Sequence, residues 1–181
     1  MTAHSRLGRQ IEEIIGLLDS RGIRFALIGG LALAPHKVVR ATMDVDLLTD
    51  ASSADAIDQE LRDRGYQCLH RSADAGNYVR GDERLDFIYA SRPVALQFLA
   101  TASELSTPFG ALRVVKAEAL IGLKLQAFVN NPRRTQDLED IRALLRANRE
   151  TINLSPVREY FKLFGRETLL AEILRDIDQA D

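Results

Sequence analysis

The sequence predicts an α/β (α+β) protein whose last third is entirely helical. Two observations predict this. Short apolar runs of strand length alternate with segments of helical periodicity over the first two-thirds of the chain. From residue 116 onward, the apolar residues recur at helical spacing alone. We therefore expect an α/β core over residues 1–115 and a C-terminal helical region over residues 116–181, packed on that core.

The first elements end in a glycine pair. Apolar residues at helical spacing predict a helix over about Arg6–Ser20, and Gly22 marks its end. The apolar stretch RFALI reads as a strand, which Gly29 and Gly30 turn into a second helix. Pro35 is compatible with that helix if it begins near Gly30, because first-turn N–H groups lack partners in any helix.

The remaining elements follow from short apolar runs and from helical periods. Strands are expected at residues 43–48, 66–70, 77–80, 84–89 and 111–115, the last as an edge strand. Helices are expected at residues 52–65, 93–100, 116–129, 135–147, 155–164 and 166–178.

Composition excludes several classes of protein. Of 181 residues, 46% are hydrophobic and 28% charged, as in soluble globular proteins. The net charge of -2 gives no general attraction to nucleic acid or to a membrane. Cys68 is the single cysteine, so no intrachain disulfide is possible. With no apolar signal core and no apolar run of transmembrane length, we expect a cytoplasmic protein with no membrane partner.

Acidic residues interrupt two of the predicted strands. Asp44 and Asp46 share one face of a strand because side chains alternate, while Val45 points into the core. Two such carboxylates repel each other unless a cation lies between them, and hard oxygen ligands suit Mg²⁺ or Mn²⁺. Asp86 is a third acid, in the run RLDFIY, and three acids on neighbouring strands suit a polymerase-like two-metal site. The alternative is that these are solvent-facing residues of an exposed sheet face.

One lysine of the helical region lies within an apolar stripe of its helix. Lys124 shares its helix face with apolar residues, so it either reaches out to solvent or points into a pocket with an anion. Asp137 lies on the apolar face of the next helix and could meet Lys124 across the two helices.

This order of motifs resembles the DNA polymerase beta-like nucleotidyltransferase superfamily. The glycine pair is followed by Asp-hydrophobic-Asp-hydrophobic and by a later strand aspartate, and RATMDVDL looks like the AbiEii-type and related minimal nucleotidyltransferases. The helical stretches LIGLKLQAF and RRTQDLEDI are similar to their downstream segment. The resemblance covers about residues 25–145 and implies a nucleotidyltransferase-like mixed sheet flanked by helices.

The resemblance also implies roles for individual residues. Asp44 and Asp46 match the metal ligands, and Asp86 matches the third carboxylate, which assists metal binding or acts as base toward the attacking hydroxyl. The residues that match nucleotide-binding positions are Gly29, Gly30, Arg40, Thr42 and Lys124.

Two positions depart from the pattern. Asp137 matches the acid of a downstream Lys-Asp pair, but Gln136 replaces the lysine. Lys37 stands where many relatives have glycine.

The resulting hypothesis is a Mg²⁺-dependent enzyme that transfers a nucleoside monophosphate from an NTP to a hydroxyl. The acceptor would be RNA, a protein or a small molecule, and the resemblance admits the toxin of a type IV toxin–antitoxin pair with a cognate antitoxin as partner. The alternatives are a catalytically inactive module of the same fold that binds a nucleotide or a partner, and a metal-dependent phosphohydrolase that releases phosphate instead of pyrophosphate.

Overall fold

The structure is a computed structural model that describes residues 5–179. The chain divides into two compact units. The first contains the described residues up to Pro35 together with Arg40–Val115, and it is α/β. The second contains His36–Val39 together with the described residues from Lys116 onward, and all its elements are helical.

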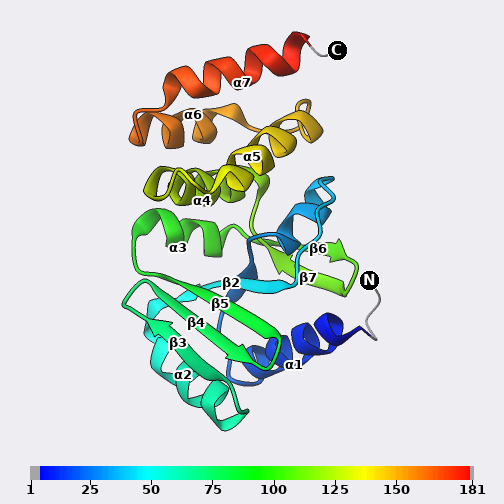
Figure 1. Ribbon diagram of the computed structural model, residues 1–181, viewed down its shortest axis with the longest axis vertical. Helices are drawn as coiled ribbons and strands as arrows, with labels where there is room; N and C mark the ends of the chain where they lie inside the picture. The colour runs from blue at the N-terminus through cyan, green and yellow to red at the C-terminus, as the bar shows by residue number, and fades with distance from the viewer. Residues whose placement is uncertain (1–4, 180–181) are drawn as a thin grey trace. The chain divides into compact units, whose positions relative to one another are not determined.

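A mixed seven-stranded sheet forms the centre of the first unit (Figure 1). Its order is β3-β4-β5-β2-β1-β7-β6, with β2 parallel to β5, β1 parallel to β7, and the other neighbours antiparallel. The strands are β1 (Phe25–Leu27), β2 (Asp44–Asp50), β3 (Gln67–Arg71), β4 (Ala75–Arg80), β5 (Glu83–Ala90), β6 (Ser103–Thr107) and β7 (Gly110–Val114). The mixed sheet flanked by helices confirms the predicted fold class.

Helices cover both faces of this sheet (Figure 1). The helical elements of the unit are α1 (Arg6–Ser20), η1 (Leu31–His36), η2 (Ala51–Ser53), α2 (Ala54–Asp63) and α3 (Pro93–Ala100). The side toward α1 and α2 is an apolar core in which the rings of Tyr78 and Phe87 meet edge to face, with centroids 6.1 Å apart. On the opposite side α3 contacts β2 and β5. The acidic residues of β2 lie on that second face, because Val45 and Leu47 point into the core.

Two expected elements differ in the structure. The helix after the glycine pair is a six-residue 3₁₀ helix, η1, that contains Pro35. Proline has no backbone N–H, so it cannot donate within a longer α-helix. The strand predicted at the sheet edge, β7, lies inside the sheet, and β6 forms the edge. β6 was missed because its sequence, SELST, has only one apolar residue and its pairing with β7 uses the backbone.

The second unit consists of four helices in succession. They are α4 (Ala117–Asn130), α5 (Thr135–Ala147), α6 (Leu154–Leu163) and α7 (Glu167–Gln179). α4 contacts α5 and α6, and α7 contacts α5 and α6. Fully buried side chains such as Ile141, Leu144 and Phe161 fill the space between them. Asn153 caps α6 by accepting a hydrogen bond from the backbone N–H of Ser155.

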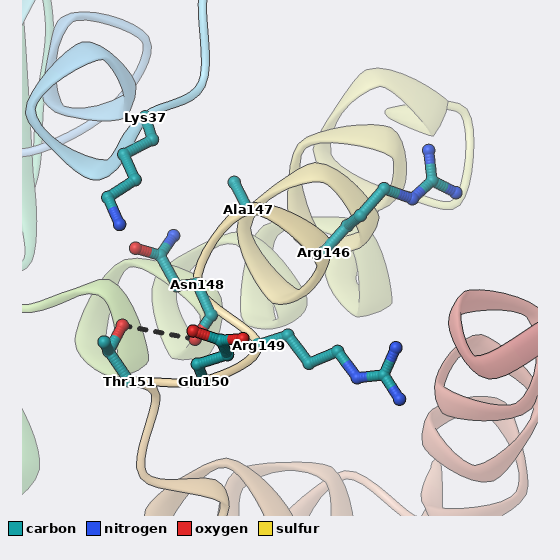
Figure 2. A pocket seen from close by; sticks show the side chains of 7 residues that line it. All are labelled: Lys37, Arg146, Ala147, Asn148, Arg149, Glu150 and Thr151. Carbon is teal, nitrogen blue, oxygen red and sulfur yellow. Dashed lines mark hydrogen bonds between the residues drawn. The ribbon is translucent and has the colours of Figure 1, made fainter. Parts of the chain in front are cut away.

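The short segment His36–Val39 is tied to the end of α5. The Asn148 side-chain amide donates to the carbonyl oxygen of His36 (2.9 Å). Lys37 has φ 65° and is the one non-glycine residue with positive φ in the part of the chain that is described. This conformation explains why glycine suits the position in similar sequences. A cavity of about 250 Å³ at the end of α5 is lined by Lys37 and by residues 146–151 (Figure 2).

Within residues 5–179, no helix is both long enough and apolar enough to cross a membrane.

Candidate active site

The three predicted strand carboxylates lie on two neighbouring strands of the sheet. Asp44 and Asp46 are half-buried on one face of β2, as the alternation predicted. Asp46 is directly opposite Asp86 in the parallel pairing of β2 with β5. Adjacent strands are about 4.8 Å apart, so the Asp46 and Asp86 side chains start from neighbouring points on the same face. The structure therefore brings these acids together although 39 residues lie between Asp46 and Asp86 in the sequence.

The Gly29 turn lies directly against Asp46. The Ile28 N–H donates to the carbonyl oxygen of Asp46 (3.0 Å), which holds the end of β1 beside β2. Gly29 has φ 64°, and a Cβ at this position would overlap the Asp46 carboxylate. Both the backbone conformation and the close approach therefore require glycine here.

Gly30 is close-packed for a second reason. A Cβ on Gly30 would be 2.6 Å from Arg40 Nη2 and 2.9 Å from Thr42 Oγ1. Arg40 and Thr42 therefore lie against the glycine turn, where the resemblance places nucleotide-binding residues. The Arg40 guanidinium therefore brings positive charge close to this turn.

Asp86 is anchored by its neighbour on β4. Asn77 is opposite Asp86 in the antiparallel pairing of β4 with β5, and Asn77 Nδ2 donates to Asp86 Oδ1 (2.8 Å). Two residues earlier on β5, the carbonyl oxygen of Arg84 accepts a hydrogen bond from Gln10 Nε2 of α1 (3.1 Å). The start of β5 is thus fixed from both sides.

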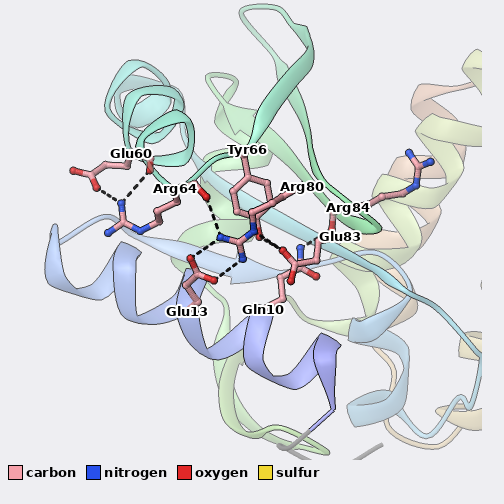
Figure 3. A network of polar contacts seen from close by, with 8 residues as sticks. All are labelled: Gln10, Glu13, Glu60, Arg64, Tyr66, Arg80, Glu83 and Arg84. Atoms are coloured by element: carbon pink, nitrogen blue, oxygen red, sulfur yellow. Dashed lines mark hydrogen bonds and ion pairs between the residues drawn. The ribbon is translucent and has the colours of Figure 1, made fainter.

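A polar network centred on Arg80 extends this support on the α1 side of the sheet (Figure 3). Arg80 forms ion pairs with Glu13 of α1 (2.6 Å) and with Glu83 of β5 (2.7 Å), and its guanidinium lies over the ring of Tyr66, 4.3 Å from the centroid. The hydrogen bond from Arg80 lowers the pKa of Glu13. Burial, together with the charge of Glu83, raises the pKa of Tyr66 to about 12. These residues join α1, β4 and β5 on the face of the sheet opposite Asp86.

In the helical unit, Lys124 of α4 meets two acids of α5. Its amine is bonded to Asp137 Oδ1 (3.1 Å) and to Asp140 Oδ2 (2.6 Å), and all three side chains are buried. Arg134 Nε donates to Asp137 Oδ2 (2.6 Å), and Gln136 Nε2 donates to Asp140 Oδ1 (3.1 Å). Asp137 was expected opposite Lys124, but Asp140 was not. Its spacing of three residues from Asp137, on the same helix face, was the available signal.

The donor set on the sheet suits a hard divalent cation. Carboxylate oxygens from Asp44, Asp46 and Asp86 are the ligand type that Mg²⁺ and Mn²⁺ prefer. Among residues 5–179 no three or more His, Cys, Asp or Glu side chains are gathered closely enough to hold a metal alone. Mg²⁺ usually binds through one or two carboxylates plus substrate phosphates, and the strand carboxylates beside the glycine turn offer such a ligand set.

Comparison with known families gives a match over the first part of the chain. The family model described as aminoglycoside-2''-adenylyltransferase matches residues 10–87. The match includes the glycine turn, Arg40, Thr42 and all three strand carboxylates, and it ends before Lys124 and Asp137. The comparison with curated protein sequences found no match.

Solved structures share the fold over most of the chain. The solution structure of the antibiotic-resistance factor ANT(2'')-Ia is 18% identical, with 92% of this chain and 95% of that chain covered and a TM-score of 0.67. The lincosamide antibiotic adenylyltransferase LnuA, solved with lincomycin bound, is 18% identical over 75% of this chain and 94% of that chain, with a TM-score of 0.56. An antigenic nucleotidyltransferase-like protein from Paracoccidioides brasiliensis is 16% identical over 96% of this chain and 94% of that chain, with a TM-score of 0.57.

The fold and the sequence match together support assignment of the chain to the nucleotidyltransferase superfamily, and they indicate a nucleotidyltransferase. Within this superfamily, the sequence similarity of residues 10–87 is to the aminoglycoside 2''-adenylyltransferases.

Proposed function

We propose that the protein is a Mg²⁺-dependent nucleotidyltransferase that transfers a nucleoside monophosphate from an NTP to a hydroxyl of a small molecule. The observation that carries the proposal is the pairing of Asp46 with Asp86 across β2 and β5, with the Gly29 turn against Asp46. The small-molecule acceptor is supported by similarity to proteins that adenylylate antibiotics, including ANT(2'')-Ia, which has also been solved with adenylyl-2''-tobramycin.

Each site residue has a proposed role. Asp44 and Asp46 hold Mg²⁺, and Asp86 assists them or accepts the proton of the attacking hydroxyl. When bound, Mg²⁺ stabilises negative charge on the phosphates in the transition state. The N–H groups of the turn at Gly29 and Gly30 bind the triphosphate, as exposed backbone donors do in other phosphate sites.

The transfer breaks a phosphoanhydride bond of the NTP and forms a phosphoester bond to the acceptor. The acceptor oxygen forms a bond to the α-phosphorus, the bond from that phosphorus to the bridging oxygen breaks, and pyrophosphate leaves. The hydroxyl proton goes to the Asp86 carboxylate. Arg40, beside Gly30, is positioned to stabilise charge on the phosphates, because a guanidinium keeps its positive charge at any working pH.

Lys124 and Asp137 are proposed to contribute to turnover, as the resemblance implies. Their ion pair also joins α4 to α5. The amine of Lys124 is already neutralised by Asp137 and Asp140. Contact with a phosphate would therefore require Lys124 to exchange at least one carboxylate for it. Turnover of Lys124→Met, measured where this variant is folded, tests that role.

The test is an acceptor panel incubated with each NTP and Mg²⁺. We expect pyrophosphate release and a nucleotidylated product with a small hydroxylated acceptor such as tobramycin or lincomycin, and no product from Asp46→Asn. Labelled RNA or protein instead would contradict the small-molecule acceptor and favour the toxin hypothesis with its antitoxin partner. Phosphate release without transfer would indicate a phosphohydrolase, and NTP binding without either product would indicate an inactive binding module.

A further inference from the structure

We infer that Asn77 is a positioning residue that orients the Asp86 carboxylate for nucleotidyl transfer. The inference rests on the proposed function, in which Asp86 acts beside Asp46. It assigns a use to a side chain that neither the sequence motif nor the family resemblance includes.

The three residues form one row across three strands. Asn77 of β4 is the register partner of Asp86 of β5, and Asp86 is the register partner of Asp46 of β2. Side chains of directly opposite residues project from the same face of a sheet, so the row runs along the face that carries the acids. Asn77, Asp86 and Asp46 are all half-buried. The amide therefore lies at the end of the carboxylate pair, on the side of Asp86 away from Asp46.

The chemistry of the contact fixes its direction. An ionised carboxylate only accepts hydrogen bonds, so the Asn77 side chain must present its NH₂ group to Asp86. The bond from Nδ2 to Oδ1 is 2.8 Å long, within the range of a strong amide-to-carboxylate hydrogen bond. It holds Oδ1 toward β4 and so sets the rotation of the carboxylate about its Cβ–Cγ bond. Oδ2, the oxygen that Asn77 does not contact, is then the atom that takes the hydroxyl proton.

A structural role alone explains the residue less well. Asparagine and aspartate are both disfavoured within strands, and this row places three of them side by side in a sheet. β4 is held in the sheet by other interactions as well, because it pairs with β5 along six residue pairs and packs Tyr78 into the core. Residues that break a local preference without a packing reason are expected mainly at functional sites.

The test compares two variants at Asn77 with a matched control. Asn77→Leu keeps the size of the side chain and removes the donor, whereas Asn77→His retains a ring N–H donor at similar reach. Gln67→Leu makes the same kind of change at an exposed position of β3 that shares the sheet face with Val79. Purified full-length proteins are assayed for nucleotidyl transfer at saturating NTP, with melting temperature measured in parallel.

We expect kcat to fall about 10- to 100-fold in Asn77→Leu, the usual cost of removing a hydrogen bond that orients a catalytic group. The KM for the NTP should change less than about threefold, because Asn77 lies on β4, away from the turn at Gly29 and Gly30. Asn77→His should recover most of the lost kcat. Gln67→Leu should match the wild type.

A second measurement does not depend on turnover. In NMR spectra of ¹⁵N-labelled protein, the side-chain NH₂ signals of Asn77, identified by their loss in Asn77→Leu, should move in Asp86→Asn and stay in place in Gln67→Leu. Unchanged kcat in Asn77→Leu, or a loss that Asn77→His does not recover and that follows the melting temperature, would overturn the inference. NH₂ signals insensitive to Asp86→Asn would also overturn it. A wild type that transfers no nucleotide to any acceptor would instead contradict the proposed function, while the NMR result would still show whether the hydrogen bond exists.

Discussion

Replacing Lys124 by methionine should destabilise the helical unit strongly. Methionine keeps most of the lysine stem and its contacts, so the change isolates the loss of the ammonium group. The variant keeps the hydrogen bonds from Gln136 to Asp140 and from Arg134 to Asp137.

The loss should be large because both partner carboxylates are buried. Asp137 is 5% exposed and Asp140 is 2% exposed, so neither carboxylate is solvated when the amine is removed. Breaking one side of a buried ion pair leaves an uncompensated charge, which costs about 3–5 kcal/mol. We therefore expect the free energy of unfolding to fall by about 3–5 kcal/mol, with a drop in Tm of roughly 6–20 °C for a chain of this size.

Urea denaturation followed by far-UV circular dichroism measures this loss. Lys162→Met is the matched control, because Lys162 is an exposed lysine of α6, and its free energy of unfolding should stay within about 0.5 kcal/mol of the wild type. Adding Asp140→Asn to Lys124→Met should recover more than about 1 kcal/mol, since it removes the charge that Lys124 no longer balances.

A loss below about 1 kcal/mol in Lys124→Met would refute this reasoning, because it would mean that water reaches the two carboxylates or that they move apart at little cost. A double variant less stable than Lys124→Met would likewise show that the buried charge is not the source of the loss.

Two further outcomes are expected in the first unit. Gly29→Ala should abolish transfer and lower the free energy of unfolding by about 1–3 kcal/mol, because its Cβ would displace Asp46. Gly22→Ala is the control, since Gly22 has nearly the same positive φ but open space around it. This variant should lose about 1 kcal/mol and keep its activity. Burial raises the pKa of Tyr66 to about 12. Above pH 10 the unfolded chain therefore loses this proton before the folded protein does. The free energy of unfolding should fall as the pH rises from 10 to 12, by at most about 1.4 kcal/mol per pH unit from this group. Urea denaturation between pH 9 and 11.5 should show a smaller fall in the free energy of unfolding for Tyr66→Phe than for the wild type. An equal fall in both proteins would contradict the raised pKa of Tyr66.

Much of the carboxylate site could be predicted from the sequence because it follows from strand alternation. An acid every second residue in an apolar run places Asp44 and Asp46 on one face, and the later run with Asp86 supplies a neighbouring strand. The meeting of Lys124 with Asp137 could be predicted in the same way from helix faces. These residues could be identified because each is a charged residue within a regular pattern of apolar residues.

What the sequence could not supply depends on strand register and on close packing. The hydrogen bond from Asn77 to Asp86 requires the alignment of β4 with β5, which no local period encodes. The contact of the Gly29 turn with Asp46 requires knowing how near two backbone segments approach. β6 was missed because an exposed strand held by backbone hydrogen bonds carries little apolar pattern.

Acceptor-dependent pyrophosphate release is the most direct test of the central claim that Asp46 and Asp86 support nucleotidyl transfer. We predict that the wild type, given ATP, Mg²⁺ and a small hydroxylated acceptor, releases one pyrophosphate for each acceptor modified. Asp46→Asn and Asp86→Asn should lose this activity while keeping a cooperative unfolding transition. Full pyrophosphate release by folded Asp46→Asn, or release of inorganic phosphate by the wild type in place of pyrophosphate, would contradict the account.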